Sequence, residues 1–262
     1  PGIDLENFHP SDVDKITYPY KDEIDKFLNK PEKPLILTLG RPDERKNLLG
    51  LLEAYGECEE LQELANLAIL AGSRKDITEM KRALRVVLKK MLLMIDKYDL
   101  YGKVAIPKKN QAKDIPWVYR IAKRRKGVAV SPSYQEGFGL TLIEASATGL
   151  PIAATKNGGP QDIIKNCHNG YLFDPTDTDE MSKKILITDI DNTLIGNQEA
   201  LDHFINYIED KRSKFCFGLA SGRTWESMKE AIDEWHIPEP DLMICSVGTE
   251  IYYKPDMTQD KD

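Results

Sequence analysis

Two aspartates separated by one residue follow an apolar run in the second half of the chain, within the segment KILITDIDNT. In an extended backbone, residues i and i+2 point to the same side, so Asp189 and Asp191 would bring two carboxylates together. Such a pair repels unless a cation lies between the charges, and Mg²⁺ prefers oxygen ligands of this kind. The pattern predicts a Mg²⁺-dependent phosphoryl-transfer site, with Asp189 as the nucleophile and Asp191 as the acid and base.

A second motif that suits a phosphate ends the apolar run KFCFGLAS. The Ser221 hydroxyl can donate to a phosphate oxygen, Gly222 gives the ligand access to the backbone, and Arg223 adds a cation. The alternative interpretation is structural, with the paired aspartates in a surface turn that caps a helix.

Two cations follow an apolar run in the first half of the chain, within PLILTLGRPDERKN. The guanidinium of Arg41 and the ammonium of Lys46 suit the two phosphates of a diphosphate. In open parallel sheets ligands bind at the carboxyl ends of strands, where these residues would lie. A solvated polar loop is the alternative.

A glycine-rich loop between a predicted strand and a predicted helix, SYQEGFGLTLIEA, carries two carboxylates. Glu136 in the loop and Glu144 in the helix can accept hydrogen bonds from sugar hydroxyls. The backbone N–H groups of Phe138, Gly139 and Leu140 can face an anion or a sugar. The alternative makes the glycines turn formers and Glu144 a helix-surface residue.

Strands and helices alternate along most of the chain, which predicts a doubly wound parallel sheet. The predicted strands are residues 34–40, 67–72, 103–107, 127–133, 151–155 and 170–174. The pattern then restarts and predicts a second, smaller α/β unit, with strands 184–189, 214–221 and 241–248 and helices 198–209 and 225–235.

Composition excludes several classes of function. The net charge of −7 argues against a general nucleic-acid or membrane-surface binder. No apolar run reaches the ~18 residues that a membrane span needs. The four cysteines form neither a CxxC pair nor a metal-ligand spacing, which favours reduced thiols in a cytoplasmic protein.

The first 175 residues resemble sucrose-phosphate synthases, which are retaining glycosyltransferases of the B fold with two Rossmann-like domains. The segments LGRPDERKN, IDKYDLYGKV, DIPWVYRIA, EGFGLTLIEASATGLPIAATKNGGPQDII and NGYLFDP carry the resemblance. It implies transfer of glucose from UDP-glucose to fructose 6-phosphate with retention and without a metal. One departure is EGFG, where many synthases of this type have EPFG.

The same resemblance implies roles for the first-half residues. Arg41 and Lys46 would hold the UDP diphosphate, Glu136 the donor sugar and Glu144 the ribose hydroxyls. The segment Phe138, Gly139 and Leu140 would lie beside the sugar and the phosphates.

The second half is similar to sucrose-phosphate phosphatases of the haloacid-dehalogenase superfamily, through TDIDNTLIGNQEAL, GLASGRTWESM and EPDLMICSVGTEIYY. The predicted organisation is an N-terminal segment (1–32), a nucleotide-sugar-binding domain (33–182) and a partial phosphatase-like domain (183–262). We expect the chain to be a fragment that binds donor, with weak or no phosphatase activity and a Mg²⁺ site only if that site is completed. The acceptor domain would come from a partner or from a longer parent chain.

Two alternatives stay open. The same fold could transfer mannose from another nucleotide sugar to a sugar phosphate. The chain could also be a non-catalytic regulatory or scaffolding product with a degenerate phosphatase-like domain.

Overall fold

The computed structural model describes residues 2–10, 20–167, 169–186, 188–189, 205–206, 208–209, 217–220, 224–234, 236–245, 250–253 and 258–259. The chain forms two compact units, Pro1–Ile185 and Leu186–Asp262, and each is described by itself.

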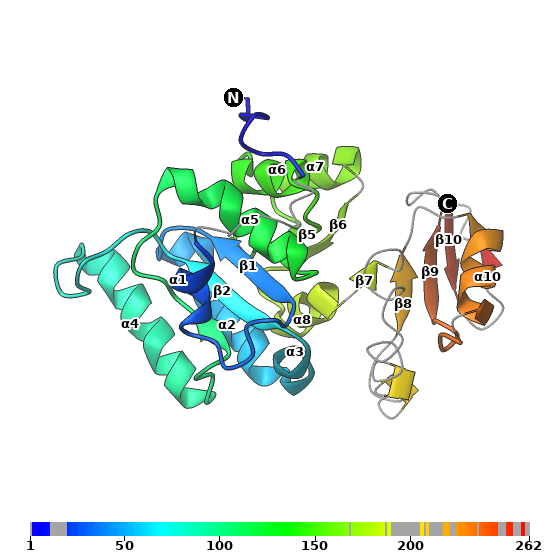
Figure 1. The fold of residues 1–262 in the computed structure, drawn as a ribbon, viewed down its shortest axis with the longest axis horizontal. Helices are drawn as coiled ribbons and strands as arrows, with labels where there is room; N and C mark the ends of the chain where they lie inside the picture. Colours follow the sequence, from blue (N-terminus) through cyan, green and yellow to red (C-terminus); the bar gives the residue numbers. More distant parts are fainter. Residues whose placement is uncertain are drawn as a thin grey trace. The chain divides into compact units, whose positions relative to one another are not determined.

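The first unit is built on a six-stranded parallel sheet with the strand order β3-β2-β1-β4-β5-β6 (Figure 1). The strands are β1 (Leu35–Leu39), β2 (Asn66–Leu70), β3 (Val104–Ala105), β4 (Val128–Ser131), β5 (Ile152–Thr155) and β6 (Gly170–Phe173). Their sequences are nearly unbroken apolar runs because a parallel sheet is buried on both faces. The predicted doubly wound α/β fold is confirmed.

Helices follow most of these strands. They are α1 (Lys21–Asp25), α2 (Leu48–Glu57), α3 (Glu59–Leu64), α4 (Arg82–Lys97), α5 (Ile115–Arg124), α6 (Leu140–Ala147), α7 (Pro160–Cys167) and α8 (Thr178–Leu186), with short 3₁₀ turns η1 (Glu44–Lys46) and η2 (Ala112–Asp114). Helices α1, α5, α6 and α7 share one apolar core with the strands, which includes Ile24, Leu35, Leu37, Val118, Tyr119, Ala129, Leu142, Ala145, Ile152 and Ile163.

The strand order reverses direction between β1 and β4, which are neighbours in the sheet. Connections from these two strands leave in opposite directions, and in open α/β sheets the ligand crevice lies at such a point, outside the carboxyl ends of the strands. The loops that follow β1 and β4 contain the predicted ligand residues of the first half.

The segment after β6 differs from its predicted structure. Residues 184–186 were predicted to begin a strand, but they end helix α8, and β7 is limited to Thr188–Asp189. The Asp177 side chain accepts from the backbone N–H of Glu180 at 2.8 Å, as a helix N-cap does. Met181 and Ile185 lie four residues apart and are buried, which is the spacing of one helix face.

The second unit contains a five-stranded sheet with the order β11-β10-β9-β8-β7. Strands β7, β8 (Gly218–Ala220) and β9 (Leu242–Cys245) are parallel, and helix α10 spans Trp225–Glu234. Strands β10 (Glu250–Tyr253) and β11 (Thr258–Gln259) add an antiparallel edge that the polar tail did not predict. The Trp225 and Tyr252 rings stack with their centroids 4.0 Å apart, which holds β10 against α10. Most of the predicted helix 198–209 lies outside the described residues.

Within the described part of the chain, no helix is long and apolar enough to cross a bilayer.

Candidate functional site

Three loops meet at the carboxyl end of the first sheet, and backbone hydrogen bonds tie them together. The N–H of Tyr134, after β4, donates to the carbonyl of Arg45, after β1, at 3.0 Å. The N–H of Glu136 donates to the carbonyl of Asn157, after β5, at 3.1 Å, and the N–H of Gly159 donates to the carbonyl of Glu136 at 2.9 Å. The three loops therefore form one connected rim around the crevice between β1 and β4.

Lys46 and Glu136 meet in this rim although 90 residues separate them in the sequence. The Lys46 Nζ lies 2.7 Å from the Glu136 Oε2, and the two side chains are 34% and 15% exposed. The Ser133 hydroxyl also donates to the Glu136 Oε2, at 3.3 Å. The pair presents a cation for a phosphate and a carboxylate for hydroxyls at one place, and each charge neutralises the other until a ligand arrives.

Arg41 lies in the same loop as Lys46 and is exposed. Its side chain has no hydrogen bond or ion pair to another described residue. The structure therefore does not bring Arg41 into the Lys46–Glu136 pair, and the guanidinium is accessible to a ligand from solvent.

Helix α6 begins four residues after Glu136. Gly139 precedes it as the N-cap with φ +80°, a left-handed conformation that a side chain disfavours. The N–H groups of the first turn have no acceptor within the helix, and they carry the positive end of its dipole. Phe138 and Leu140 expose 46% and 40% of their surface, so both residues face solvent at the start of this helix.

Glu144 lies in the second turn of α6, where side chains lean back toward the helix N-terminus. Its Oε2 accepts a hydrogen bond from the Tyr119 hydroxyl of α5 at 3.2 Å. Burial raises the pKa of the Glu144 carboxyl, and the bond from Tyr119 opposes that rise. Glu144 is therefore a half-buried acceptor, unlike the surface residue of the alternative interpretation.

Sequence reasoning missed two residues that contact the carboxylates of this site, Ser133 and Tyr119. Ser133 had a readable signal, because it follows β4 and precedes Glu136 by three residues. The Asn157-Gly158-Gly159 segment follows a predicted strand, and its sequence fits a ligand loop or a plain turn equally well. The structure gives it a supporting role, because it pairs with the backbone of Glu136.

Gly158 is required by this pairing. Its φ is +101°, and a Cβ there would lie 2.1 Å from the carbonyl oxygen of Glu136. We expect Gly158→Ala to destabilise the first unit by about 2 kcal/mol or more in urea unfolding, because the loops must separate. Gly137→Ala is the matched control, since a Cβ at that position meets nothing within 4 Å and should change stability little. Equal stability of the two variants would contradict the close approach at Gly158.

The predicted phosphatase-like residues are only partly described. Asp189 ends β7, and its backbone is the register partner of Ala220, the last residue of β8. Asp191, Ser221, Gly222 and Arg223 lie outside the described residues. The predicted Mg²⁺ site at Asp189 and Asp191 therefore stays a prediction.

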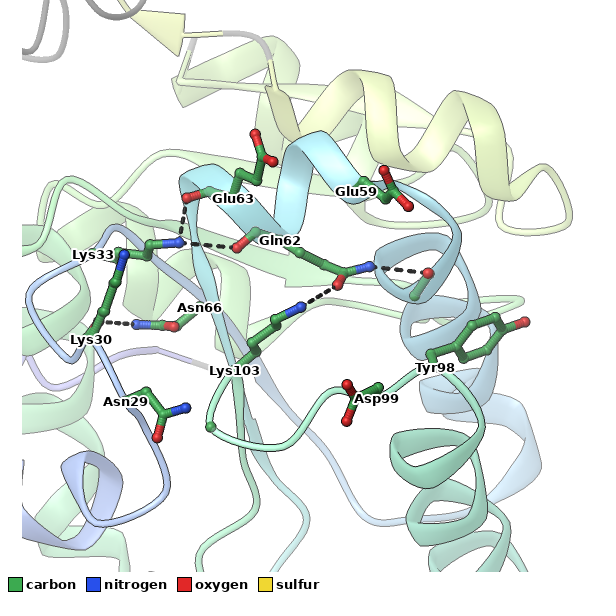
Figure 2. Close-up of a pocket in the computed structure, with 12 residues that line it drawn as sticks. Asn29, Lys30, Lys33, Glu59, Gln62, Glu63, Asn66, Tyr98, Asp99 and Lys103 are labelled. Atoms are coloured by element: carbon green, nitrogen blue, oxygen red, sulfur yellow. Dashed lines mark hydrogen bonds between the residues drawn. The ribbon is translucent and has the colours of Figure 1, made fainter.

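A pocket of about 500 Å³ lies at the opposite, amino end of β1, β2 and β3 and is lined by Lys30, Lys33 and Lys103 (Figure 2). The Lys33 Nζ donates to the backbone carbonyls of Gln62, at 3.1 Å, and Glu63, while the Lys103 Nζ donates to the Gln62 Oε1 at 2.8 Å. Burial, with repulsion from the other two lysines, lowers the pKa of Lys33. Because carbonyls at the end of α3 receive the Lys33 ammonium, we assign Lys33 to capping of that helix, and Lys103 to support of the Gln62 side chain.

Gln62 is the centre of this pocket. Its Nε2 donates to the carbonyls of Tyr55 (3.1 Å) and Gly56 (3.0 Å) at the end of α2. We expect Gln62→Leu to cost about 2–3 kcal/mol in urea unfolding, because it leaves buried groups without partners. Gln161→Leu, at an exposed position, should stay within about 0.5 kcal/mol of the parent chain. A Gln62→Leu chain as stable as its parent would show that the network is not structural.

Two family models match the chain. The model of glycosyl transferases group 1 matches residues 20–211, and the model of sucrose-6F-phosphate phosphohydrolase matches residues 182–262. The predicted phosphatase resemblance of the second half is thereby confirmed, and the first half is confirmed as a glycosyltransferase.

Curated relatives and solved structures agree with these models. Sucrose-phosphate synthase 4 of Arabidopsis thaliana is 48% identical over 189 residues, which is 71% of this chain and 18% of the relative. A probable sucrose-phosphate synthase of Beta vulgaris is 40% identical over 261 residues, 95% of this chain and 25% of the relative. The structure of a sucrose-phosphate synthase from Thermosynechococcus elongatus matches with a TM-score of 0.54 and 28% identity, over 70% of this chain and 41% of that one.

The chain thus spans a quarter or less of the length of these two curated relatives. The model of glycosyl transferases group 1 covers residues 20–211, which is most of the chain. These residues include the strands and loops that form the rim described above. This chain belongs to the glycosyl transferases group 1 family.

Proposed function

We propose that this chain forms the nucleotide-sugar-binding part of a sucrose-phosphate synthase, which transfers glucose from UDP-glucose to fructose 6-phosphate with retention of configuration. The observation that carries the proposal is the Lys46–Glu136 pair at the β1–β4 crevice. The similarity to sucrose-phosphate synthases, at 40–48% identity, supports the choice of sugars.

Each side chain has a role that follows from its charge and place. Lys46 and Arg41 hold the diphosphate and neutralise the charge that grows on UDP as the glycosidic bond breaks. Glu136 accepts hydrogen bonds from hydroxyls of the glucose, and Glu144 accepts those of the ribose. Two cations can supply this neutralisation, so the proposed transfer takes no metal ion, and chelation by EDTA should leave donor binding unchanged.

The acceptor sugar phosphate is proposed to bind on a domain outside this chain, supplied by a longer parent protein or a partner. Donor binding is then the activity that the chain alone should retain. The phosphatase-like unit has no part in this step.

Calorimetric titration of the whole chain with UDP-glucose and with GDP-mannose tests the proposal and its main alternative. We expect UDP-glucose to bind and GDP-mannose to bind at least about 10-fold more weakly, a difference of about 1.4 kcal/mol. Preference for GDP-mannose would assign the fold to mannosyl transfer, and no binding of either would favour a non-catalytic product.

A further inference from the structure

Tyr119 connects the core of the first unit to the site. It lies in α5, its side chain is fully buried, and its ring packs edge-on against Phe8 with centroids 6.1 Å apart. Its hydroxyl reaches α6, where it lies 2.9 Å from the carbonyl oxygen of Thr141 and 3.2 Å from the Glu144 Oε2. The single hydroxyl proton is shared between these two acceptors, so the phenol links the Glu144 carboxylate to the Thr141 carbonyl and can fix the direction of that carboxylate.

The ring of Tyr119 has little freedom to move. The neighbouring Arg120 donates to the backbone carbonyls of Asn7, at 2.8 Å, and His9, at 3.4 Å. These two bonds hold the segment 2–10 on α5 and keep Phe8 against the Tyr119 ring. The hydroxyl is therefore presented to α6 from a rigid support, as a positioning group requires.

The protonation states fit this role. Burial raises the pKa of Tyr119 well above its ordinary value, so the hydroxyl keeps its proton at neutral pH and acts as a donor. Burial also raises the pKa of Glu144, and the donated hydrogen bond lowers it. The hydrogen bond from Tyr119 is the side-chain interaction that lowers the pKa of Glu144.

We propose that Tyr119 is a positioning residue that holds the Glu144 carboxylate in the orientation that accepts both hydroxyls of a ribose. This inference rests on the proposed function, because it takes the ligand to be a nucleoside diphosphate. A ribose offers two neighbouring O–H donors, and a carboxylate has four acceptor positions on two oxygens. Tyr119 occupies one position on Oε2, so the other acceptor positions stay available for the two ribose hydroxyls.

The test combines a protein variant with a ligand variant in calorimetric titrations of the whole chain. Tyr119→Phe keeps the ring and removes only the hydroxyl. We expect it to weaken UDP binding by about 5- to 10-fold, as loss of one hydrogen bond to a charged group does. Binding of 2′,3′-dideoxy-UDP, which lacks both ribose hydroxyls, should be equally weak in the parent chain and in Tyr119→Phe. Tyr101→Phe is the matched control. Its exposed hydroxyl donates to the Asp96 carboxylate at 2.8 Å, and neither residue belongs to the rim.

A pH series with UDP-glucose gives a second readout. The ionised Glu144 carboxylate accepts more and stronger hydrogen bonds than the protonated carboxyl does, so affinity should fall as the pH decreases through its pKa. Removing the Tyr119 bond removes a contribution that lowers this pKa, so the fall should begin at higher pH in Tyr119→Phe. UDP-glucose is used because its phosphates do not titrate near neutral pH.

Three results would overturn the inference. Tyr119→Phe could bind UDP as the parent chain does. It could lose the same factor for UDP and for dideoxy-UDP, which would indicate general loosening of α5 and α6. Third, Tyr119→Phe and Glu144→Gln could both bind UDP as the parent chain does. The ribose role of Glu144 in the proposed function would then fail as well. Loss in Glu144→Gln without loss in Tyr119→Phe overturns the inference alone.

Discussion

Replacement of Lys46 by Met is expected to weaken UDP binding by about 10- to 100-fold, the effect of losing a charge-assisted hydrogen bond to a diphosphate. Lys46 holds its ammonium 2.7 Å from Glu136 in the rim, so it need not be ordered when the ligand arrives. Met keeps an unbranched side chain that is one atom shorter, and it removes the charge. The measurement is calorimetric titration of the whole chain with UDP.

Glu136→Gln distinguishes the role of Glu136 from that of Lys46. The carboxylate is proposed to contact the sugar, so this variant should bind UDP-glucose more weakly. Its affinity for UDP should be retained or rise, because Lys46 loses the partner that neutralises it. Lys183→Met, at an exposed lysine of α8 that pairs with Asp179, serves as a control for loss of a positive charge. UDP affinity that survives Lys46→Met unchanged would remove Lys46 from the site.

Asp25→Ala is expected to have the largest effect on stability, about 3 kcal/mol or more for the unfolding of the first unit. The Arg125 Nη2 lies 2.5 Å from the Asp25 Oδ1, and the side chains are only 9% and 13% exposed. Among the described residues, the Nη1 of Arg125 is already buried without a hydrogen-bond partner. Removing Asp25 therefore leaves a buried guanidinium with a full charge and no carboxylate. Urea unfolding followed by far-ultraviolet circular dichroism measures the change.

The control for this variant is a carboxylate in an exposed pair. Asp179 forms an ion pair with Lys183 in α8, and their side chains are 76% and 55% exposed. Asp179→Ala should lower the free energy of unfolding by at most about 0.5–1 kcal/mol. Similar losses of unfolding free energy in Asp25→Ala and Asp179→Ala would show that the buried Arg125–Asp25 pair matters no more to stability than an exposed pair.

The placement of Lys46 and Glu136 at the same edge of the sheet could be predicted from the sequence, because parallel strands place their carboxyl ends at one edge. Each residue follows a recognisable apolar strand, and the order of strands and helices indicates a doubly wound fold. Only the direct contact between the two side chains needed the structure.

The contact between Tyr119 and Glu144 could not be predicted in this way. It depends on how far apart α5 and α6 lie when they pack on the sheet. The Tyr119 position in a helical run also suits a core residue, and it is one, so the pattern carries no sign of the hydroxyl's partner.

Helix α8 was misassigned for a different reason. The run KILIT has the composition of a strand, but Met181 and Ile185 complete an apolar helix face that begins before it. Strands β10 and β11 were missed because their pairing comes from neighbouring strands rather than from an apolar pattern of their own.

A crystal structure of the whole chain with UDP bound is the most direct test of the central claim, that the β1–β4 crevice is a nucleoside diphosphate site. We predict the diphosphate within hydrogen-bond distance of Lys46 and Arg41, and the ribose hydroxyls on the carboxylate of Glu144. UDP bound among the lysines at the amino end of the sheet, or anywhere outside the rim formed by the three loops, would contradict the claim.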